Sequence, residues 1–267
     1  MITQVKEYIN KQKLFLEEDK LILAISGGGD SVCLMHVLLD LGFRFDLAHC
    51  NFKLRAEESD SDEIFVKELA KKHNLKLHSK SFSTKEYANQ NKISIQMAAR
   101  DQRYKWLNEL LKSENAKYIA VAHHQDDAIE TFFINLIRGT GITGLLGIAE
   151  KKSNIVRPLL NFNRSDIEEY LMTKKQTFRE DSSNTSVKYL RNKIRIQLIP
   201  LLEEMNPKIK ETIKDEINIL KDTSTVFSYQ IKNVRKEVIK INNEVISLNI
   251  QKLKTLSPLK FQQRLLT

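Results

Sequence analysis

The chain has 267 residues, of which 41% are hydrophobic, enough for one large domain or for a domain with an appendage. Its 43 Lys and Arg residues outnumber its 34 Asp and Glu residues, and the formal charge of +9 favours a polyanionic partner over an anionic metabolite alone. The two cysteines lack CxxC spacing and support neither a zinc site nor a dithiol redox motif. No apolar run approaches the roughly 18 residues of a membrane span, so we expect a protein of the reducing cytoplasm that does not enter membranes.

The first half of the chain alternates β-like runs with amphipathic helical stretches. The predicted strands are residues 21–26, 45–52, 75–82 and 117–123, and the predicted helices lie near residues 31–41, 59–73, 95–112 and 125–138. This alternation predicts an α/β fold with a doubly wound, mainly parallel sheet. Ligands of such sheets bind beyond the carboxyl ends of the strands, where the strand order reverses.

The first predicted strand runs into the loop SGGGDS (Ser26–Ser31) and then into a helix. Unpaired backbone N–H groups at a helix N-terminus, approached closely through glycines, form an anion pocket; the alternative is a tight turn with Asp30 or Ser31 as N-cap. The loop matches neither GxxxxGK[ST] nor GxGxxG. Because an acid in an anion pocket repels phosphate unless a cation intervenes, Asp30 suggests a bridging Mg²⁺.

The segment AHHQDD follows the fourth predicted strand. On a helix that starts near Gln125, Asp127 and Glu130 share one face, and Asp126 is rotated away from them. Two interpretations stay open from the residues alone: a site for a divalent metal, and acids that pair with the helix dipole.

The residue composition changes after residue 139. A glycine-rich connection leads to a helix whose start is marked by Ser165 and Glu168 as a capping box. Further on, Arg191 and Arg195 are four residues apart, which places them on one cationic face or in a solvated patch. From Ile209 the apolar spacing predicts one long helix or two stacked helices.

SGGGDS resembles the SGGxDS motif of the PP-loop ATP pyrophosphatases, which cleave ATP between the α and β phosphates to adenylate an oxygen. Other segments resemble the tRNA(Ile)-lysidine synthetases within that group. These segments are AHCNFKLRAEESDSDE (48–63), AARDQRY (98–104), AHHQDDAIETFFINLIRGTGITGLLGI (122–148), RPLL (157–160), DSSN (181–184) and RNKIR (191–195). The resemblance covers about residues 20–207, and it departs from the family pattern at Phe52, where the family usually has a histidine.

The resemblance implies an adenine nucleotide alpha hydrolase-like fold and a ligase. In the implied reaction, ATP adenylates the C2 oxygen of the wobble cytidine of an isoleucine tRNA with a CAU anticodon. The ε-amine of free lysine then displaces AMP to form lysidine. ATP is the co-substrate, Mg²⁺ the cofactor, and lysine and tRNA the partners; the oligomeric state stays open, a homodimer included.

The resemblance also assigns residues to these roles. The nucleotide is expected to contact Ser26, Gly27, Gly28, Gly29, Asp30, Ser31 and His49, with Mg²⁺ on Asp30. The catalytic residues are expected to be Asp30, Arg100, Asp127, Glu130 and Arg191, with the two arginines neutralising phosphate or the adenylate and the carboxylate pair orienting lysine. We expect residues 1–207 to form the catalytic domain and 208–267 a helical appendage that leads to further tRNA-binding domains.

Three other functions stay open. The chain is alternatively another PP-loop enzyme that modifies tRNA, such as a thiolase, although its only cysteines, Cys33 and Cys50, precede the region where a thiolase carries sulfur. It is alternatively an inactive tRNA-binding module that keeps the fold, or a metal-dependent phosphoesterase built on HHQDD.

Overall fold

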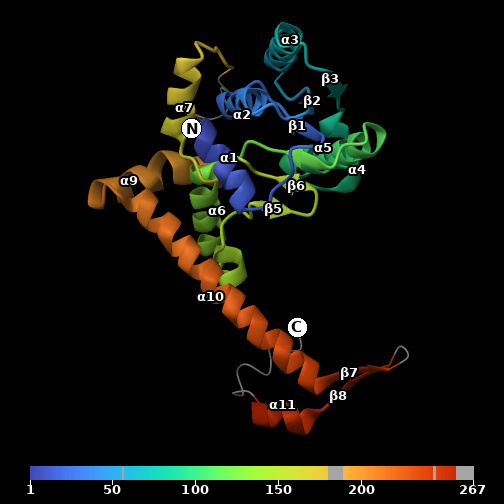
Figure 1. The fold of residues 1–267 in the computed structure, drawn as a ribbon, viewed down its shortest axis with the longest axis vertical. Helices are drawn as coiled ribbons and strands as arrows, with labels where there is room; N and C mark the ends of the chain where they lie inside the picture. Colours follow the sequence, from blue (N-terminus) through green and yellow to red (C-terminus); the bar gives the residue numbers. More distant parts are fainter. Residues whose placement is uncertain (56, 180–188, 243–244, 257–267) are drawn as a thin grey trace.

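A computed structural model describes residues 1–55, 57–179, 189–242 and 245–256. Its centre is a six-stranded sheet with the order β3-β2-β1-β4-β6-β5 (Figure 1). The strands are β1 (Leu21–Ala24), β2 (Phe45–Asn51), β3 (Leu77–Ser81), β4 (Tyr118–Ala120), β5 (Lys151–Lys152) and β6 (Ile155–Val156). All neighbours pair in parallel except β5 and β6. The predicted doubly wound, mainly parallel sheet is therefore confirmed.

Helices cover the sheet and lead away from it. They are α1 (Ile2–Lys11), α2 (Gly29–Asp40), α3 (Glu57–Lys72), α4 (Thr84–Asn91), α5 (Ile95–Ser113), α6 (Gln125–Arg138), the short helix η1 (Ile142–Leu145), α7 (Arg164–Thr173), α8 (Leu190–Lys193), the π-helical turn η3 (Ile194–Leu198), α9 (Ile199–Met205), α10 (Ile209–Val238) and α11 (Ile250–Leu256). Those that connect parallel strands run back across the sheet, so their N-termini lie at its carboxyl edge.

Alternating side chains of the strands build a core on each face of the sheet. Leu21 and Leu23 of β1 pack in one cluster with buried residues of α1, α2 and α7. Ile22 points to the other face, where it packs with Trp106 and Leu107 of α5. This period of two is the pattern of a sheet that is buried on both faces.

The strand order reverses between β1 and β4. The chain moves outward from β1 through β2 to β3 and then returns to the other side of β1 to form β4. The segments that follow β1 and β4, Ser26–Ser31 and the start of α6, therefore meet at one edge of the sheet, as the sequence predicts.

Three details differ from the prediction. The fourth strand ends at Ala120 rather than near residue 123, because the chain turns out of the sheet toward α6. Strands β5 and β6 are only two residues each, too short for a period of two to reveal. The predicted capping box of Ser165 and Glu168 is wrong: Asn163 caps α7, and its side chain accepts a hydrogen bond from the backbone N–H of Asp166.

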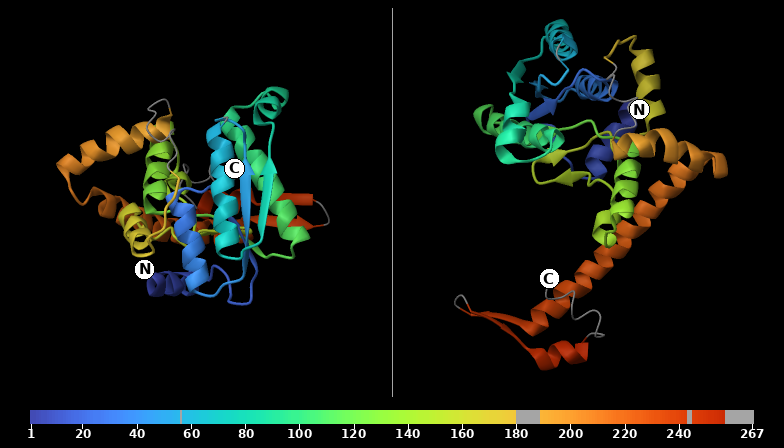
Figure 2. Two further views of the ribbon diagram at one scale, coloured as in Figure 1. Left: turned by 90° about the horizontal axis from the view of Figure 1, so that it is seen from above. Right: turned by 180° about the vertical axis from the view of Figure 1, so that it is seen from behind.

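The segment after residue 208 begins as one continuous helix, α10, rather than two stacked ones. Its first turns pack Ile213 against Ile129 of α6 and Ile194 of η3. Its far end carries a two-stranded antiparallel sheet, β7 (Ile239–Asn242) and β8 (Val245–Leu248), and α11, well away from the central sheet (Figures 1 and 2). The appendage is mostly helical but includes this hairpin, and a domain boundary at residue 207 stays a prediction.

Within the described ranges, the helices lack the combination of length and apolar character that crossing a bilayer requires.

Candidate active site

The loop Ser26–Ser31 joins β1 to α2 at the carboxyl edge of the sheet. Gly27 has φ +94°, a backbone conformation that side chains rarely adopt, and a Cβ there would lie 3.3 Å from the ring of Phe65. Gly28 is the N-cap of α2, and a Cβ on Gly29 would lie 3.3 Å from the ring of Phe178. The tight turn and the close packing explain why glycine stands at these positions. The first N–H groups of α2 have no acceptor within the helix.

The two serine hydroxyls brace this loop internally. Ser31 Oγ donates to the carbonyl of Gly28 at 2.9 Å and lies 3.2 Å from Ser26 Oγ. Ser26 Oγ in turn accepts from the N–H of Gly28 at 3.2 Å. The hydroxyls therefore hold the loop in shape, and backbone N–H groups at the start of α2 are left as the donors for an anion.

His124 connects the loop to α6. Its Nε2 lies 3.6 Å from Asp30 Oδ2 and 3.7 Å from Asp127 Oδ2, and its Nδ1 lies 3.3 Å from Asp126 Oδ2. Burial alone would lower the pKa of His124, but the neighbouring carboxylates of Asp126, Asp30 and Asp127 raise it to about 10. A cationic imidazole thus lies among three carboxylates that come from two separate segments.

Asp127 and Glu130 do share one face of α6, and two arginines from beyond residue 189 meet them. Arg195 Nε donates to Glu130 Oε1 at 2.5 Å, and Arg191 Nε lies 3.4 Å from Glu130 Oε2. Asp127 Oδ1 lies 3.9 Å from Arg191 Nη1 and 4.0 Å from Arg195 Nη2. Glu130 is fully buried, and burial raises the pKa of its carboxyl although Arg195 acts against this. We call these four residues the acid–arginine cluster.

Asp126 is turned away from that cluster, as its place on the helix predicts. It pairs with Lys210 of α10 at 3.2 Å and accepts from the N–H of Arg164 at 3.0 Å. Asp126 therefore fastens α6 to α7 and α10.

Arg100, expected to act on phosphate, is an exposed residue of α5 and does not join the acid–arginine cluster. Its guanidinium stacks over the ring of Tyr104 at 5.0 Å. Burial lowers the pKa of His123, next to His124, to about 4, and the positive charges of Arg157, Arg191 and Arg100 act in the same direction. Arg100 is therefore close enough to the start of α6 to contribute to its electrostatics.

His49, expected to contact the nucleotide, lies beneath the loop and is buried. Its Nδ1 is 3.0 Å from the carbonyl oxygen of Ile25, the residue before the loop. Burial lowers the pKa of the His49 ring, so the neutral form that donates to this carbonyl is favoured. In this structure His49 supports the loop from below.

Several residues of the site are not evident from the sequence. Arg179 donates its N–H to the carbonyl of Gly27 at 2.9 Å, and its side chain pairs with Asp62 of α3 at 3.1 Å. Together with Phe178, Arg179 places the segment before residue 180 against the loop. The predicted DSSN motif, residues 181–184, lies outside the described residues.

The chemistry of the donors fits a magnesium ion at Asp30. Its carboxylate is 45% exposed at the mouth of the loop, and Mg²⁺ is usually held by one or two carboxylates together with water and phosphate oxygens. In the described part of the chain, the three potential ligand atoms that lie within 4.8 Å of one another belong to Asp46, His78 and Glu114 rather than to the acids of HHQDD.

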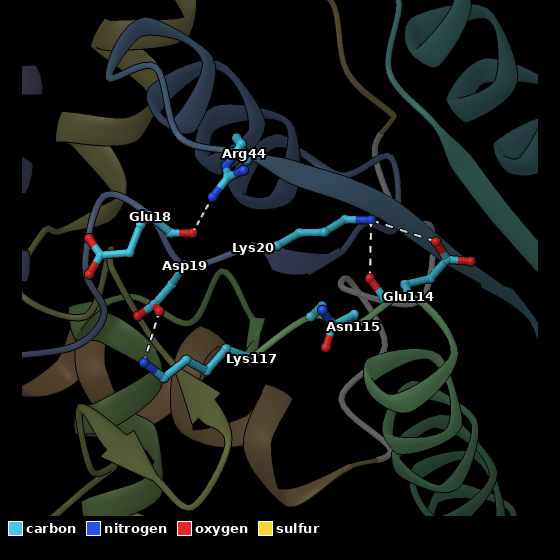
Figure 3. Close-up of a pocket in the computed structure, with 8 residues that line it drawn as sticks. Glu18, Asp19, Lys20, Arg44, Glu114, Asn115 and Lys117 are labelled. Carbon is cyan, nitrogen blue, oxygen red and sulfur yellow. Dashed lines mark hydrogen bonds and ion pairs between the residues drawn. The ribbon is translucent and has the colours of Figure 1, made fainter.

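That grouping lies at the opposite, amino edge of the sheet. Lys20 pairs with Asp46 at 2.9 Å, so lysine already balances its charge. Nearby, a cavity of about 470 Å³ is lined by the residues just before β1, β2 and β4, and Figure 3 shows Lys20 directed toward Glu114 and Lys117 directed toward Asp19. Within this cavity Lys20 pairs with Glu114 and Lys117 pairs with Asp19, and the cavity lies at the edge of the sheet opposite the loop.

The geometry at the carboxyl edge defines a nucleotide-binding protein of the PP-loop class, and the model of the PP-loop domain family matches residues 1–202. A tRNA(Ile)-lysidine synthase from Bacteroides thetaiotaomicron is 49% identical over 240 residues, which are 90% of this chain and 56% of the relative. One from Petrotoga mobilis is 33% identical over 93% of this chain and 79% of the relative. The chain belongs to the tRNA(Ile)-lysidine synthase family.

The chain spans about half the length of the relatives from Bacteroides thetaiotaomicron and Porphyromonas gingivalis, 56% and 47%. Among solved structures, the U34-tRNA thiolase NcsA from Methanococcus maripaludis superposes with a TM-score of 0.66 over 82% of this chain and 80% of its own. At 16% identity this likeness establishes the fold alone.

The two cysteines differ in burial, and Cys50 of β2 is only partly buried. Cys33 of α2 is fully buried, and burial strongly raises the pKa of its thiol. Burial also raises the pKa of Cys50 to about 11. Neither thiol is therefore prepared to carry sulfur, which disfavours the thiolase alternative.

Proposed function

We propose that this chain joins free lysine to C2 of the wobble cytidine in an isoleucine tRNA with a CAU anticodon, at the expense of ATP. One observation supports this proposal most directly. The loop Ser26–Ser31 and the acid–arginine cluster lie at the same edge of the sheet, with His124 between Asp30 and Asp127, in a chain of the lysidine synthase family. A site for the phosphates of ATP and a carboxylate site for a cationic amine would then lie side by side, as a reaction between these two substrates requires.

The first step forms a bond between the C2 oxygen of the cytidine and the α phosphorus of ATP, and diphosphate leaves. The N–H groups at the start of α2 bind the phosphates, since a helix N-terminus favours negative charge. Asp30 would hold Mg²⁺, which supplies charge neutralisation for the leaving diphosphate. Arg100 and Arg191 are proposed to neutralise the adenylate.

In the second step the ε-amine of lysine attacks C2, and AMP leaves with the C2 oxygen. The amine attacks only after it loses a proton. We assign Asp127 and Glu130 to binding lysine, with Arg191, which is 41% exposed, at the solvent side of the cluster. Splitting one difficult substitution into two easier ones is the gain from adenylation.

We also place the reaction in the cytoplasm, where tRNA, ATP and lysine are available together.

The experiment that tests the proposal incubates the chain with ATP, labelled lysine and tRNA transcripts. Label should enter an isoleucine transcript with a CAU anticodon, with one AMP released for each lysine incorporated, and a transcript whose wobble cytidine is replaced by uridine should stay unlabelled. AMP release without label in RNA, or ATP:diphosphate exchange without any lysine transfer, contradicts the proposed function.

A further inference from the structure

A column of contacting aromatic side chains runs from the core to the surface at the carboxyl edge of the sheet. Trp106 and Phe82 are buried at its base, with ring centroids 6.1 Å apart. Phe52, at the end of β2, stacks on Phe82 at 5.5 Å with 23° between the ring planes. The guanidinium of Arg103 lies 5.3 Å above the ring of Phe52 and is exposed. The column therefore ends in an exposed, positively charged guanidinium.

Phe52 occupies the position where the lysidine synthetase pattern usually has a histidine. It follows His49 and Asn51 on the same strand, and both of those residues are buried. The phenyl ring is half-buried and has no polar atom, so it contributes only a flat surface on which Arg103 rests. The departure from the family pattern thus has a structural role in this chain.

Among the residues that the structure describes, no carboxylate neutralises the charge on the column. In the described ranges, Arg103 and Arg100 have no ion pair with a carboxylate, and both are exposed on the same face of α5. Because α5 returns the chain from β3 toward β4, its N-terminal half lies at the carboxyl edge of the sheet, on the side of the loop and α6. Met97, on the first turns of the same helix, is 54% exposed.

We propose that Arg103, packed over the ring of Phe52, which itself stacks on Phe82, is the stacking platform for an unpaired base of the RNA loop that presents the reacting cytidine. This rests on the proposed function and names the surface that receives its RNA. A base stacks on a guanidinium plane as it does on an aromatic ring, and one such contact contributes about 1–3 kcal/mol. Packing against Phe52 restricts the Arg103 side chain in advance, so less side-chain entropy is lost on binding.

Stacking and simple charge attraction make different predictions. A phosphate contact needs only the positive charge, which lysine supplies equally well, whereas a base needs the plane, which lysine lacks. Arg103→Lys therefore separates the two. Phe52→Leu removes the ring and keeps an apolar side chain, and Phe52→His restores a ring.

The test measures the affinity of the full chain for a hairpin RNA with a CAU anticodon loop, by fluorescence anisotropy at constant salt. Arg103→Lys and Phe52→Leu are each expected to weaken binding about 10-fold, and Phe52→His to restore most of the affinity. Lys105→Ala, which removes an exposed charge from the same helix, is the matched control and should change affinity less than about 2-fold.

A second measurement identifies the base. Loop nucleotides are replaced one at a time by abasic residues; one replacement should weaken binding to the unaltered chain about 10-fold and leave binding to Arg103→Lys unchanged.

Wild-type affinity in Arg103→Lys, with circular dichroism unchanged, overturns the platform. That result leaves the proposed function intact if the unaltered chain still transfers labelled lysine. Loss of lysine transfer with the stacking effects preserved overturns the function and not the platform.

Discussion

Asp30 is the residue on which ATP activation should depend most. Its carboxylate is half-exposed at the loop, where it is placed to hold a divalent cation against phosphate oxygens. Asp30→Asn should lower the rate of ATP:diphosphate exchange by about 100-fold or more, and residual activity should require higher Mg²⁺ concentrations. Asp40→Asn, at the other end of α2, is the control and should leave exchange unchanged. Wild-type exchange in Asp30→Asn would refute the role of Asp30 as a metal ligand.

Glu130 presents a different case, because it is buried and its oxygens face Arg195 and Arg191. Glu130→Gln keeps the shape of the side chain and removes its charge, so lysine transfer should fall at least 10-fold in kcat/KM, while ATP:diphosphate exchange should change little. Because the substitution also leaves Arg195 without its carboxylate, the free energy of unfolding should fall by about 2 kcal/mol and must be measured alongside. Unchanged KM and kcat for lysine would remove Glu130 from the lysine site.

Helices, strands and the loop could be predicted because their signals are local. The apolar run 21–26, three consecutive glycines and the face shared by Asp127 and Glu130 all lie within a few residues of one another. The contact of His124 with Asp30 and that of Arg195 with Glu130 join segments far apart in the chain, so periodicity carried no sign of them. The spacing of RNKIR predicts that Arg191 and Arg195 share one face, but it does not predict which acid they contact.

At the scale of elements, one carboxylate ties helix α3 to two strands. Glu63 accepts hydrogen bonds from Asn51 of β2 and Ser79 of β3, both at 2.9 Å, and pairs with Lys67 at 2.8 Å. Hydrogen bonds from Lys67 and Asn51 lower the pKa of Glu63 to about 2. Because the folded pKa lies below the unfolded value of about 4.3, this stabilisation is present above that pH and is lost as pH falls toward 2.

Glu63→Gln should therefore lower the free energy of unfolding by about 1–2 kcal/mol at pH 7, with the value reduced for partial solvent screening. The difference from the unaltered chain should shrink as the pH is lowered from 5 to 3, as followed by urea unfolding. Glu68→Gln, an exposed site of the same helix, should have little effect at any of these pH values. A Glu63→Gln difference that does not vary with pH would contradict the assigned pKa.

At the scale of the whole molecule, the arrangement separates two kinds of binding. Lysine and the phosphates of ATP are expected to meet a few fixed groups at the edge between β1 and β4. RNA is expected to draw on a larger exposed surface, because the formal charge of +9 is spread over the chain and Arg100 and Arg103 lie on the same face of α5. Affinity for RNA should then depend on counterion release, whereas affinity for lysine should not.

Raising salt from about 50 to about 200 mM should weaken RNA binding roughly 50-fold if about four phosphates are contacted, because the logarithm of the affinity falls linearly with the logarithm of salt concentration. The KM for lysine, measured at saturating RNA over the same range, should change less than about 2-fold, since burial of Asp127 and Glu130 limits screening. Anisotropy titrations with the hairpin RNA and initial rates of lysine transfer provide the two measurements. Equal salt dependence of both would mean that lysine meets an exposed, screened site, and the assignment to Asp127 and Glu130 would fail.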